Sequence, residues 1–232
     1  MTAVPPWVAL GGCAIVLAGF SGARWLSGRL GHPPWASPVL LTALAAIMAL
    51  AITGTPLAAF DAATAPLRWM LGPALVALAL VIDGNRALLK AQAGPVVLAV
   101  TGGAMVGLGS ALGLGRLVGL DGELLSALVT KTVTTPFTVA IMTRVGGPVA
   151  LAAALSVLTG VIGALLVPAM FDRLRVQDAS ARALGLGVSS HIVGTDWLTR
   201  RDPRSGGLSA LAFVLTGLLF AVVVPLAWRW LG

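Results

Sequence analysis

Long apolar runs recur along the whole chain and constrain its fold more than any other feature. They cover residues 8–17, 38–52, 66–82, 95–115, 148–171 and 208–228. A bilayer core about 30 Å thick needs about 20 apolar residues per spanning helix, and most of these runs reach that length with their flanks. Only 10% of the residues are charged, too few for the solvated faces of a soluble domain. We therefore predict an all-α polytopic membrane protein with about six spanning helices, forming one transmembrane domain (1–232) in the cell inner (plasma) membrane.

The N-terminus and the net charge are interpreted within this membrane fold. No Lys or Arg precedes Trp7, so the first run lacks the basic region of a signal peptide and is expected to be a retained helix. The formal net charge of +7 comes from basic residues in short loops, a pattern typical of membrane topology and lipid-headgroup contact. No nucleic-acid partner is expected, because the charge lies between spans and not on one continuous face.

The second half of the chain contains an internal repeat. VLTGVIGALLVP at 157–168 matches VLTGLLFAVVVP at 214–225 at an offset of 57 residues, and Asp121 and Asp178 are separated by the same offset. Each unit has a polar centre followed by a long apolar stretch. The predicted organisation is a group of N-terminal helices (1–115) followed by two repeat units, 121–171 and 178–232.

Loop charge predicts how these units cross the membrane. Lys and Arg gather in four short segments, 24–32, 83–90, 172–182 and 199–205, and such loops usually lie on the cytoplasmic side. All four fall on one side if 122–145 and 180–198 are re-entrant, entering and leaving the membrane on the same face. Each half of 122–145 is about a dozen residues, too short to span alone. The alternative is two full-length helices that violate the charge rule.

The re-entrant interpretation makes the repeat inverted. A unit of one hairpin and one spanning helix crosses the membrane an odd number of times, so its second copy is upside down. Inverted repeats with interrupted helices near the bilayer midplane are an architecture of secondary transporters.

The first polar centre is TKTVTTPF at 130–137. Pro136 removes a backbone donor and disfavours helix at the preceding residue, so the helix is expected to break around Thr134–Pro136. The hydroxyls of this segment can bind a ligand or satisfy the freed backbone groups, and a half-helix starting there would favour an anion. Lys131 is a functional candidate because an intramembrane charge is costly; the alternatives are snorkelling and pairing with Asp121 or Glu123. The substrate-binding candidates in this centre are Lys131, Thr132, Thr134, Thr135 and Pro136.

The second polar centre is GLGVSSHIVGTDW at 185–197. Its serines and histidine can hydrogen-bond a carboxylate, and a histidine can titrate near physiological pH. The substrate-binding candidates are Ser189, Ser190, His191, Gly194 and Thr195, and the proton-coupling candidates are His191 and Asp196. For Asp196 the competing interpretation is an interfacial segment end. Gly72–Pro73 predicts a third interruption or an ordinary proline kink.

Other chemistry has little support in the sequence. Two histidines and one cysteine do not form a metal-binding pattern by spacing, and no catalytic constellation or cofactor motif is evident, so neither an enzyme nor a cofactor is expected. The glycine-rich TGGAMVGLG at 101–109 lies within a span, where packing through small residues explains it better than nucleotide binding.

Three segments together resemble the LrgB/CidB family: LGPALVALALVI, then KTVTTPFTVAI followed by VGGP, then ALGLGVSSHIVGT. The resemblance covers about residues 36–225. Family members include bacterial partners of holin-like LrgA/CidA proteins, described as modulating murein hydrolase export and autolysis, and the plastid glycolate/glycerate translocator. Bacterial members have also been linked to pyruvate and related monocarboxylates. In the first centre the resemblance implicates Lys131, Thr132, Thr134, Thr135 and Pro136. In the second it implicates Ser190, His191, Gly194 and Thr195, and in the first half of the chain Gly72 and Pro73. The chain departs from the family pattern at Asp196 and Trp197 and at RRDPRSGG (200–207).

The sequence therefore supports two functional hypotheses. The first is a secondary transporter of small monocarboxylates (glycolate, glycerate, lactate or pyruvate type), proton-coupled, with alternating access by movement of a rigid unit. The second is a holin-associated regulator of murein hydrolase export and autolysis that carries no substrate. A homo-oligomer (dimer) or an LrgA/CidA-like membrane partner is expected in either case, because 232 residues is small for a transporter.

Overall fold

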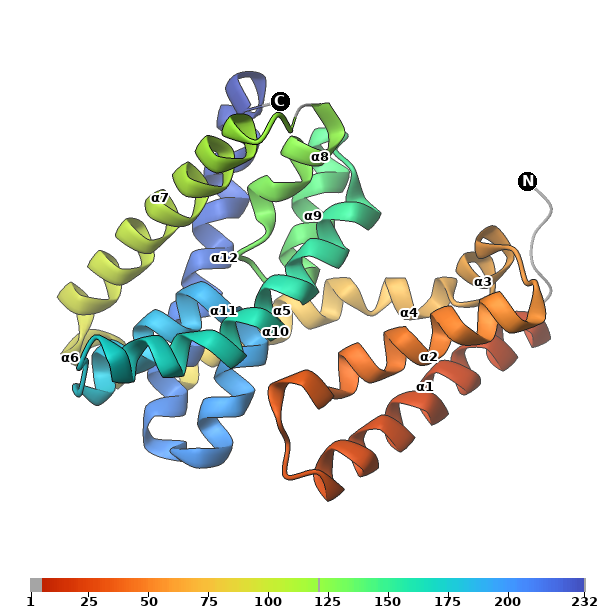
Figure 1. The fold of residues 1–232 in the computed structure, drawn as a ribbon, viewed down its shortest axis with the longest axis horizontal. Coiled ribbons are helices and arrows are strands. Elements are labelled where there is room, and N and C mark those ends of the chain that lie inside the picture. The colour runs from red at the N-terminus through yellow and green to blue at the C-terminus, as the bar shows by residue number, and fades with distance from the viewer. Residues whose placement is uncertain (1–5, 121, 232) are drawn as a thin grey trace. The chain divides into compact units, whose positions relative to one another are not determined.

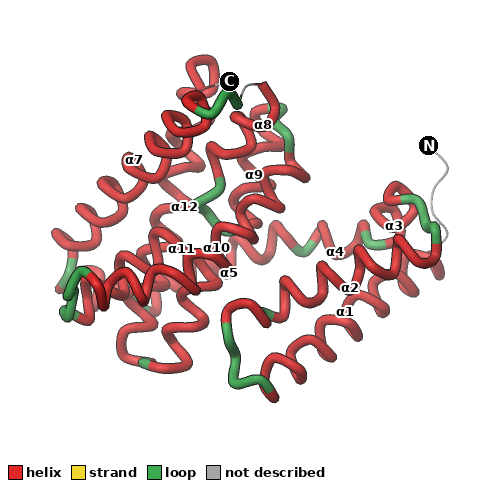
Figure 2. Tube along the Cα trace, viewed as in Figure 1, coloured by secondary structure: helices red, strands yellow, loops and turns green. Residues whose placement is uncertain are grey.

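The computed structural model describes residues 6–120 and 122–231, and within these ranges all regular structure is helical (Figures 1 and 2). The chain divides into two compact units, Met1–Val76 and Ala77–Gly232. Both predicted repeat units lie in the second. The predicted N-terminal group (1–115) contributes helices to both.

The first unit is built on α1 (Pro6–Arg29), against which α2 (Pro38–Thr53), α3 (Leu57–Ala63) and α4 (Ala65–Trp69) pack. A 3₁₀ turn, η1 (Pro34–Ala36), leads into α2, and the Ser37 hydroxyl caps it by accepting a hydrogen bond from the Leu40 N–H at 3.3 Å. Gly54, with φ 65°, ends α2 in the left-handed conformation that glycine adopts at low cost.

The interruption expected at Gly72–Pro73 falls just before these residues. α4 ends at Trp69, Met70 separates the two helices, and α5 (Leu71–Gly84) begins with Leu71. Gly72 and Pro73 therefore lie in the first turn of α5. A proline is tolerated there because the first turn of a helix has no intrahelical partner for its backbone N–H.

The second unit contains the remaining helices and both polar centres. In chain order they are the end of α5, α6 (Arg86–Ala91), α7 (Ala93–Leu117), α8 (Gly122–Ala127), the 3₁₀ turn η2 (Leu128–Thr130), α9 (Thr135–Val145), α10 (Val149–Arg173), α11 (Ala179–Arg201) and α12 (Pro203–Leu231). α11 packs against α7, α10 and α12. A hydrophobic core cluster of the second unit contains Val96 and Val100 of α7, Leu184 and Val188 of α11, and Leu208 of α12.

Four helical stretches of the described residues are long and apolar enough to span a bilayer: Ala65–Gly84, Ala93–Leu117, Val149–Arg173 and Pro203–Trp228. α2, with 16 residues, is shorter. Large apolar side chains on these stretches are exposed, including Val76, Val97, Ile162 and Val222, as expected of surfaces that face lipid. The chain is therefore a multi-pass helical membrane protein.

Local signals fix the ends of the helices around the polar centres. Gly146, with φ 71°, ends α9, and the Asp178 carboxylate caps α11 by accepting from the Ala181 N–H at 2.7 Å. Asp202, in the turn between α11 and α12, accepts hydrogen bonds from the Ser205 hydroxyl and from backbone N–H groups. The Ser205 hydroxyl is the main reason that the pKa of Asp202 lies below its ordinary value. Asp121, the predicted start of the first repeat unit, lies outside the described residues.

Candidate functional site

The first polar centre is a four-residue gap between two short helical arms. The first arm is α8 followed by η2, which ends at Thr130. Residues 131–134 are not helical, and the second arm, α9, begins at Thr135. The gap precedes Pro136 because proline fits the first turn of α9. Figure 1 shows the two arms as a hairpin whose outer ends lie near the end of α7. The Thr138 hydroxyl donates to the carbonyls of Thr130 and Val133, at 3.2 and 3.3 Å, and so satisfies backbone groups that the break frees.

The second polar centre is a sharp kink at one residue of α11. His191 has φ 39° and ψ −135°, whereas the residues on both sides are helical. A positive φ is costly for a residue with a side chain and persists only where the surrounding packing holds it. The His191 side chain is 2% exposed. Before the kink α11 packs close to α10, with Gly185 facing Phe171, and after it Thr199 packs against Gly206 of α12.

Ser156 of α10 connects the two centres. Its hydroxyl donates to the carbonyl of Val133 in the first gap at 2.6 Å, and its own carbonyl lies 2.9 Å from His191 Nε2. A carbonyl oxygen only accepts hydrogen bonds, so Nε2 carries the proton and donates it. Ser156 is fully buried. One residue of a largely apolar helix thus touches both breaks.

Glycines at equivalent repeat positions accommodate the two broken helices. A Cβ at Gly160 of α10 would overlap the His191 ring, and a Cβ at Gly217 of α12 would overlap the Phe137 ring of α9. Gly160 and Gly217 are 57 residues apart, the offset of the sequence repeat. The long helix of each repeat unit therefore contacts a side chain from the broken helix of the other repeat unit. The same offset relates Thr134, which precedes α9, to His191.

A cavity of about 760 Å³ in the second unit reaches both centres. Its walls are α7, the first gap and the first half of α11. Lys131 and Thr132 line it from the first centre and Ser189 from the second. Gly107 of α7 lies against Thr132, and Gly103 lies against Val188. The glycine-rich run at 101–109 therefore lets α7 approach both centres closely, as helix packing through small residues requires.

Several buried polar atoms around the breaks have no hydrogen-bond partner among the described residues. They are the hydroxyl oxygens of Thr130 and Thr132 and Nδ1 of His191. No carboxylate of the described residues forms an ion pair with Lys131. Unpaired buried polar groups are unfavourable and rare in folded proteins. Of these groups, Thr132 and Lys131 line the cavity, where a bound polar molecule could reach them.

The structure separates the candidate residues into three groups. Lys131, Thr132 and Ser189 line the cavity. Thr134, Ser190, His191, Gly194 and Thr195 are buried in packing contacts, with Ser190 against Gly163 and the Thr195 hydroxyl 2.8 Å from that of Ser209. Thr135 and Pro136 are half-buried in the first turn of α9.

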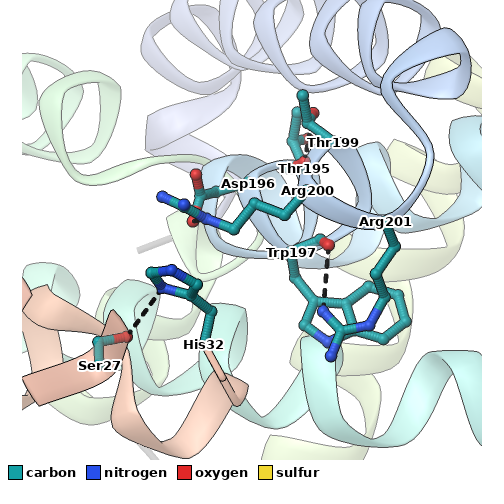
Figure 3. Close-up of polar contacts among 8 residues, drawn as sticks. All are labelled: Ser27, His32, Thr195, Asp196, Trp197, Thr199, Arg200 and Arg201. Atoms are coloured by element: carbon teal, nitrogen blue, oxygen red, sulfur yellow. Dashed lines mark hydrogen bonds and ion pairs between the residues drawn. The ribbon is translucent and has the colours of Figure 1, made fainter. Parts of the chain in front are cut away.

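Asp196 lies in the second half of α11 and is exposed. It forms an ion pair with Arg200 at 2.9 Å. Figure 3 shows it with neighbouring contacts of the same helix, in which the Thr199 hydroxyl donates to the Thr195 carbonyl and Arg201 to the Trp197 carbonyl. This arrangement agrees with the interfacial interpretation of Asp196. The structure shows no group of three His, Cys, Asp or Glu side chains suited to a metal ion among the described residues.

The sequence analysis did not single out Ser156, Gln92 or Ser180. Ser156 lies among VALAAALSVLTG, where its one distinguishing sign is a hydroxyl followed by Gly160 and Gly163 at helical spacing. Gln92 and Ser180 line the cavity near the starts of α7 and α11. Nothing in the local sequence signals that these two helices face each other.

The fold and the site define a class: a multi-pass helical membrane protein in which two broken helices meet around a cavity. Comparison with known proteins identifies the family within this class. The model of the LrgB-like family matches residues 16–230, so the chain belongs to that family. The family resemblance noted in the sequence is confirmed.

Individual relatives differ in how they are described. The chain is 27% identical to the uncharacterized protein YwbG of Bacillus subtilis, over 82% of this chain and 85% of that protein. It is 32% identical to the plastidal glycolate/glycerate translocator 1 of Arabidopsis thaliana, over 64% of this chain but only 29% of that protein. It is 23% identical to the holin-like protein CidB of Staphylococcus aureus, over 83% of this chain and 84% of that protein. No solved structure matches the chain.

Proposed function

We propose that this protein is a secondary transporter of small monocarboxylates of the glycolate, glycerate, lactate or pyruvate type. The observation that carries the proposal is the cavity that both broken helices reach, with Lys131, Thr132 and Ser189 in its wall. The lysine ammonium suits a carboxylate, and the two hydroxyls suit the hydroxyl or keto oxygen at C2. The 32% identity to a protein named as a glycolate/glycerate translocator supports the substrate class.

The proposed topology has about six spanning helices and two re-entrant elements, 122–145 and 180–198, in an inverted repeat. Two observations support it. In the first broken element, α9 turns back toward the side on which α8 begins (Figure 1). Gly160 and Gly217 lie at equivalent repeat positions, and each contacts the broken helix of the other repeat unit, an exchange that an approximate pseudo-two-fold axis would produce. Movement of these elements as one body would give alternating access.

Proton coupling is proposed to involve His191. Its Nε2–H is held by the Ser156 carbonyl, and its Nδ1 has no partner among the described residues, so Nδ1 is the atom that would accept a proton. Asp196 is a weaker candidate because Arg200 already pairs with it on an exposed surface. We also propose a dimer or an LrgA/CidA-like membrane partner. The large apolar side chains exposed on α7 could contact such a neighbour in the membrane.

The second candidate is a holin-associated regulator of murein hydrolase export and autolysis without a substrate. Its support is the 23% identity to holin-like CidB over 83% of this chain, a longer match than the one to the translocator. In that case the cavity would be filled by lipid or by a partner, and Lys131 would carry no substrate.

The deciding experiment is counterflow of radiolabelled glycolate, lactate and pyruvate in proteoliposomes that contain the purified full-length protein. We expect saturable uptake that falls about tenfold to a hundredfold in Lys131→Met, because a hydrogen bond to a charged group is worth about 1.5–3 kcal/mol. Lys90→Met is the matched control. It removes the chain's other lysine, which lies exposed at the end of α6, and uptake should stay within about twofold of the parent.

One result would contradict transport: equal uptake by protein-containing and empty vesicles, both with and without a co-purified LrgA-like protein. A different result would leave transport intact and contradict the binding site. If Lys131→Met and Lys90→Met lower uptake to the same extent, the lysine in the cavity has no special role.

A further inference from the structure

The cavity is polar at its two ends and apolar in between. It extends along α7 from Gln92 to Gly107, which is about 22 Å at 1.5 Å per helical residue. Lys131, Thr132 and Ser189 form the inner end, and Gln92, Asp178 and Ser180 form the outer end, where α7 and α11 begin. The molecule that fits such a space has one polar head and an apolar remainder.

The inner end can hold a carboxylate and one further oxygen. The Thr132 residue is 8% exposed, and its hydroxyl has no partner among the described residues although it borders the cavity. An unsatisfied buried hydroxyl beside a lysine gains a hydrogen bond when a ligand oxygen arrives. Ser189 contributes a second hydroxyl, which shares a 3.1 Å contact with Ser190.

The middle of the cavity presents hydrocarbon. From α7 it is lined by Leu98 and Ala99, and from α11 by Leu184 and Val188. These side chains offer no hydrogen bond to the hydroxyl groups of a polar substrate such as glycerate. They gain free energy instead from contact with an alkyl group that leaves water.

The cavity also disfavours a second negative charge on the substrate. A small dicarboxylate is much shorter than the cavity, so with one carboxylate at Lys131 its second would lie in the apolar middle, where an unpaired charge is costly. The outer end offers it no partner either, because Asp178 is itself a carboxylate and already caps α11 through the Ala181 N–H. A monocarboxylate with an uncharged alkyl end avoids this cost.

We infer that the preferred substrates are 2-hydroxy or 2-oxo monocarboxylates that carry an alkyl group on C2, with the carboxylate at Lys131, the C2 oxygen at Thr132 and Ser189, and the alkyl group between α7 and α11. This inference rests on the proposed transport function and narrows its substrate class. It ranks the acids by the size of their apolar group, so glycolate, which has none, is the poorest member of the series.

The test is competition for uptake of radiolabelled L-lactate into proteoliposomes of the full-length protein. The competitors form a homologous series: glycolate, L-lactate, L-2-hydroxybutyrate and L-2-hydroxyhexanoate. We expect the inhibition constant to fall about fourfold for each added methylene, which is the factor that corresponds to full burial of one methylene. Malate, a dicarboxylate of similar size, should inhibit least.

Variants distinguish binding in the cavity from simple partition of apolar acids into the membrane. Ala99→Leu fills the apolar middle, so the inhibition constant of 2-hydroxyhexanoate should rise about tenfold while that of glycolate stays within about twofold. Ala93→Leu is the matched control, because Ala93 lies exposed on the same helix and does not line the cavity. Leu98→Ser is a second variant that removes apolar wall at an exposed position and should weaken binding of the long acid selectively.

The outcomes separate this inference from the proposed function. Saturable lactate uptake with inhibition constants that stay flat or rise along the series would overturn the alkyl preference and leave transport intact. So would an equal effect of Ala99→Leu on glycolate and on 2-hydroxyhexanoate. If neither lactate nor any other acid of the series is taken up, both the function and the inference are wrong.

Discussion

The two polar centres carry similar residue types but are built in different ways. The first, at 131–134, is a gap of four non-helical residues that opens into a cavity. The hydroxyls of Thr132 in the gap and of Thr130 just before it lack partners among the described residues. The second, at His191, is a single non-helical residue whose side chain is enclosed by α10 and bonded to Ser156. The first centre therefore leaves groups accessible from the cavity, whereas the His191 side chain is enclosed by the packing around it.

The largest expected effect tests whether the second centre is the more tightly packed of the two. In Gly160→Ala the new methyl group overlaps the buried His191 ring. In Gly107→Ala the methyl group lies 3.3 Å from the Thr132 side chain, which borders the cavity and has room to move. We expect Gly160→Ala to lower the free energy of unfolding by about 3 kcal/mol, the upper end for overpacking.

The same measurement on Gly107→Ala gives the comparison. Its cost should be under about 1 kcal/mol, because alanine also has the higher helix propensity. Thermal unfolding of the purified variants in one detergent measures both values. Equal destabilisation at the two glycines would mean that the first centre is as closely packed as the second.

A smaller effect is expected from cutting the link between the centres. Ser156→Ala removes the hydroxyl that donates to the buried Val133 carbonyl but leaves the backbone carbonyl that accepts from His191. Leaving a buried carbonyl without its donor lowers the free energy of unfolding by about 1–2 kcal/mol. The carbonyl concerned, that of Val133, belongs to the first centre. We expect lower stability and a raised KM for lactate, with the His191 contact kept.

Ser126→Ala is the control for this variant. The Ser126 hydroxyl donates to the carbonyl of Gly122 in its own helix at 2.8 Å, so its removal should change stability by no more than about 0.5 kcal/mol. If Ser156→Ala is equally mild, the 2.6 Å contact to Val133 contributes nothing measurable and Ser156 does not join the centres.

The sequence predicts the membrane class, the family and the interruptions for identifiable physical reasons. Apolar length requires a bilayer, and Pro136 within an apolar run requires a break near it. The position of the gap could be predicted only to a few residues, because proline belongs to the first turn of the following helix. At His191 no proline or local backbone signal marks the kink, and only the polar composition of 185–197 pointed to this segment.

The cavity and the role of Ser156 could not be predicted in this way, because both depend on which helices face each other. Ser156 is one hydroxyl in a long apolar helix, and its importance follows from where Val133 and His191 lie in space. Polarity marks candidate residues in the sequence. It does not distinguish Lys131 and Thr132, which line the cavity, from Ser190 and Thr195, which are buried in packing contacts. The structure adds this distinction through burial and partners.

The smallest expected effect concerns the anchoring of the second centre to α12. The buried hydroxyls of Thr195 and Ser209 lie 2.8 Å apart and join the arm that follows His191 to α12. A double-mutant cycle of Thr195→Val and Ser209→Ala, read from unfolding in detergent, should give a coupling energy of about 0.5–1.5 kcal/mol. Each single variant leaves one buried hydroxyl without its partner. Each should therefore lower the free energy of unfolding by more than half of the loss seen in the double variant. Additive losses would show that α12 does not hold this arm through the hydroxyl pair, and the packing of Gly187 against Ser209 and Ala212 would then be what fixes the second centre.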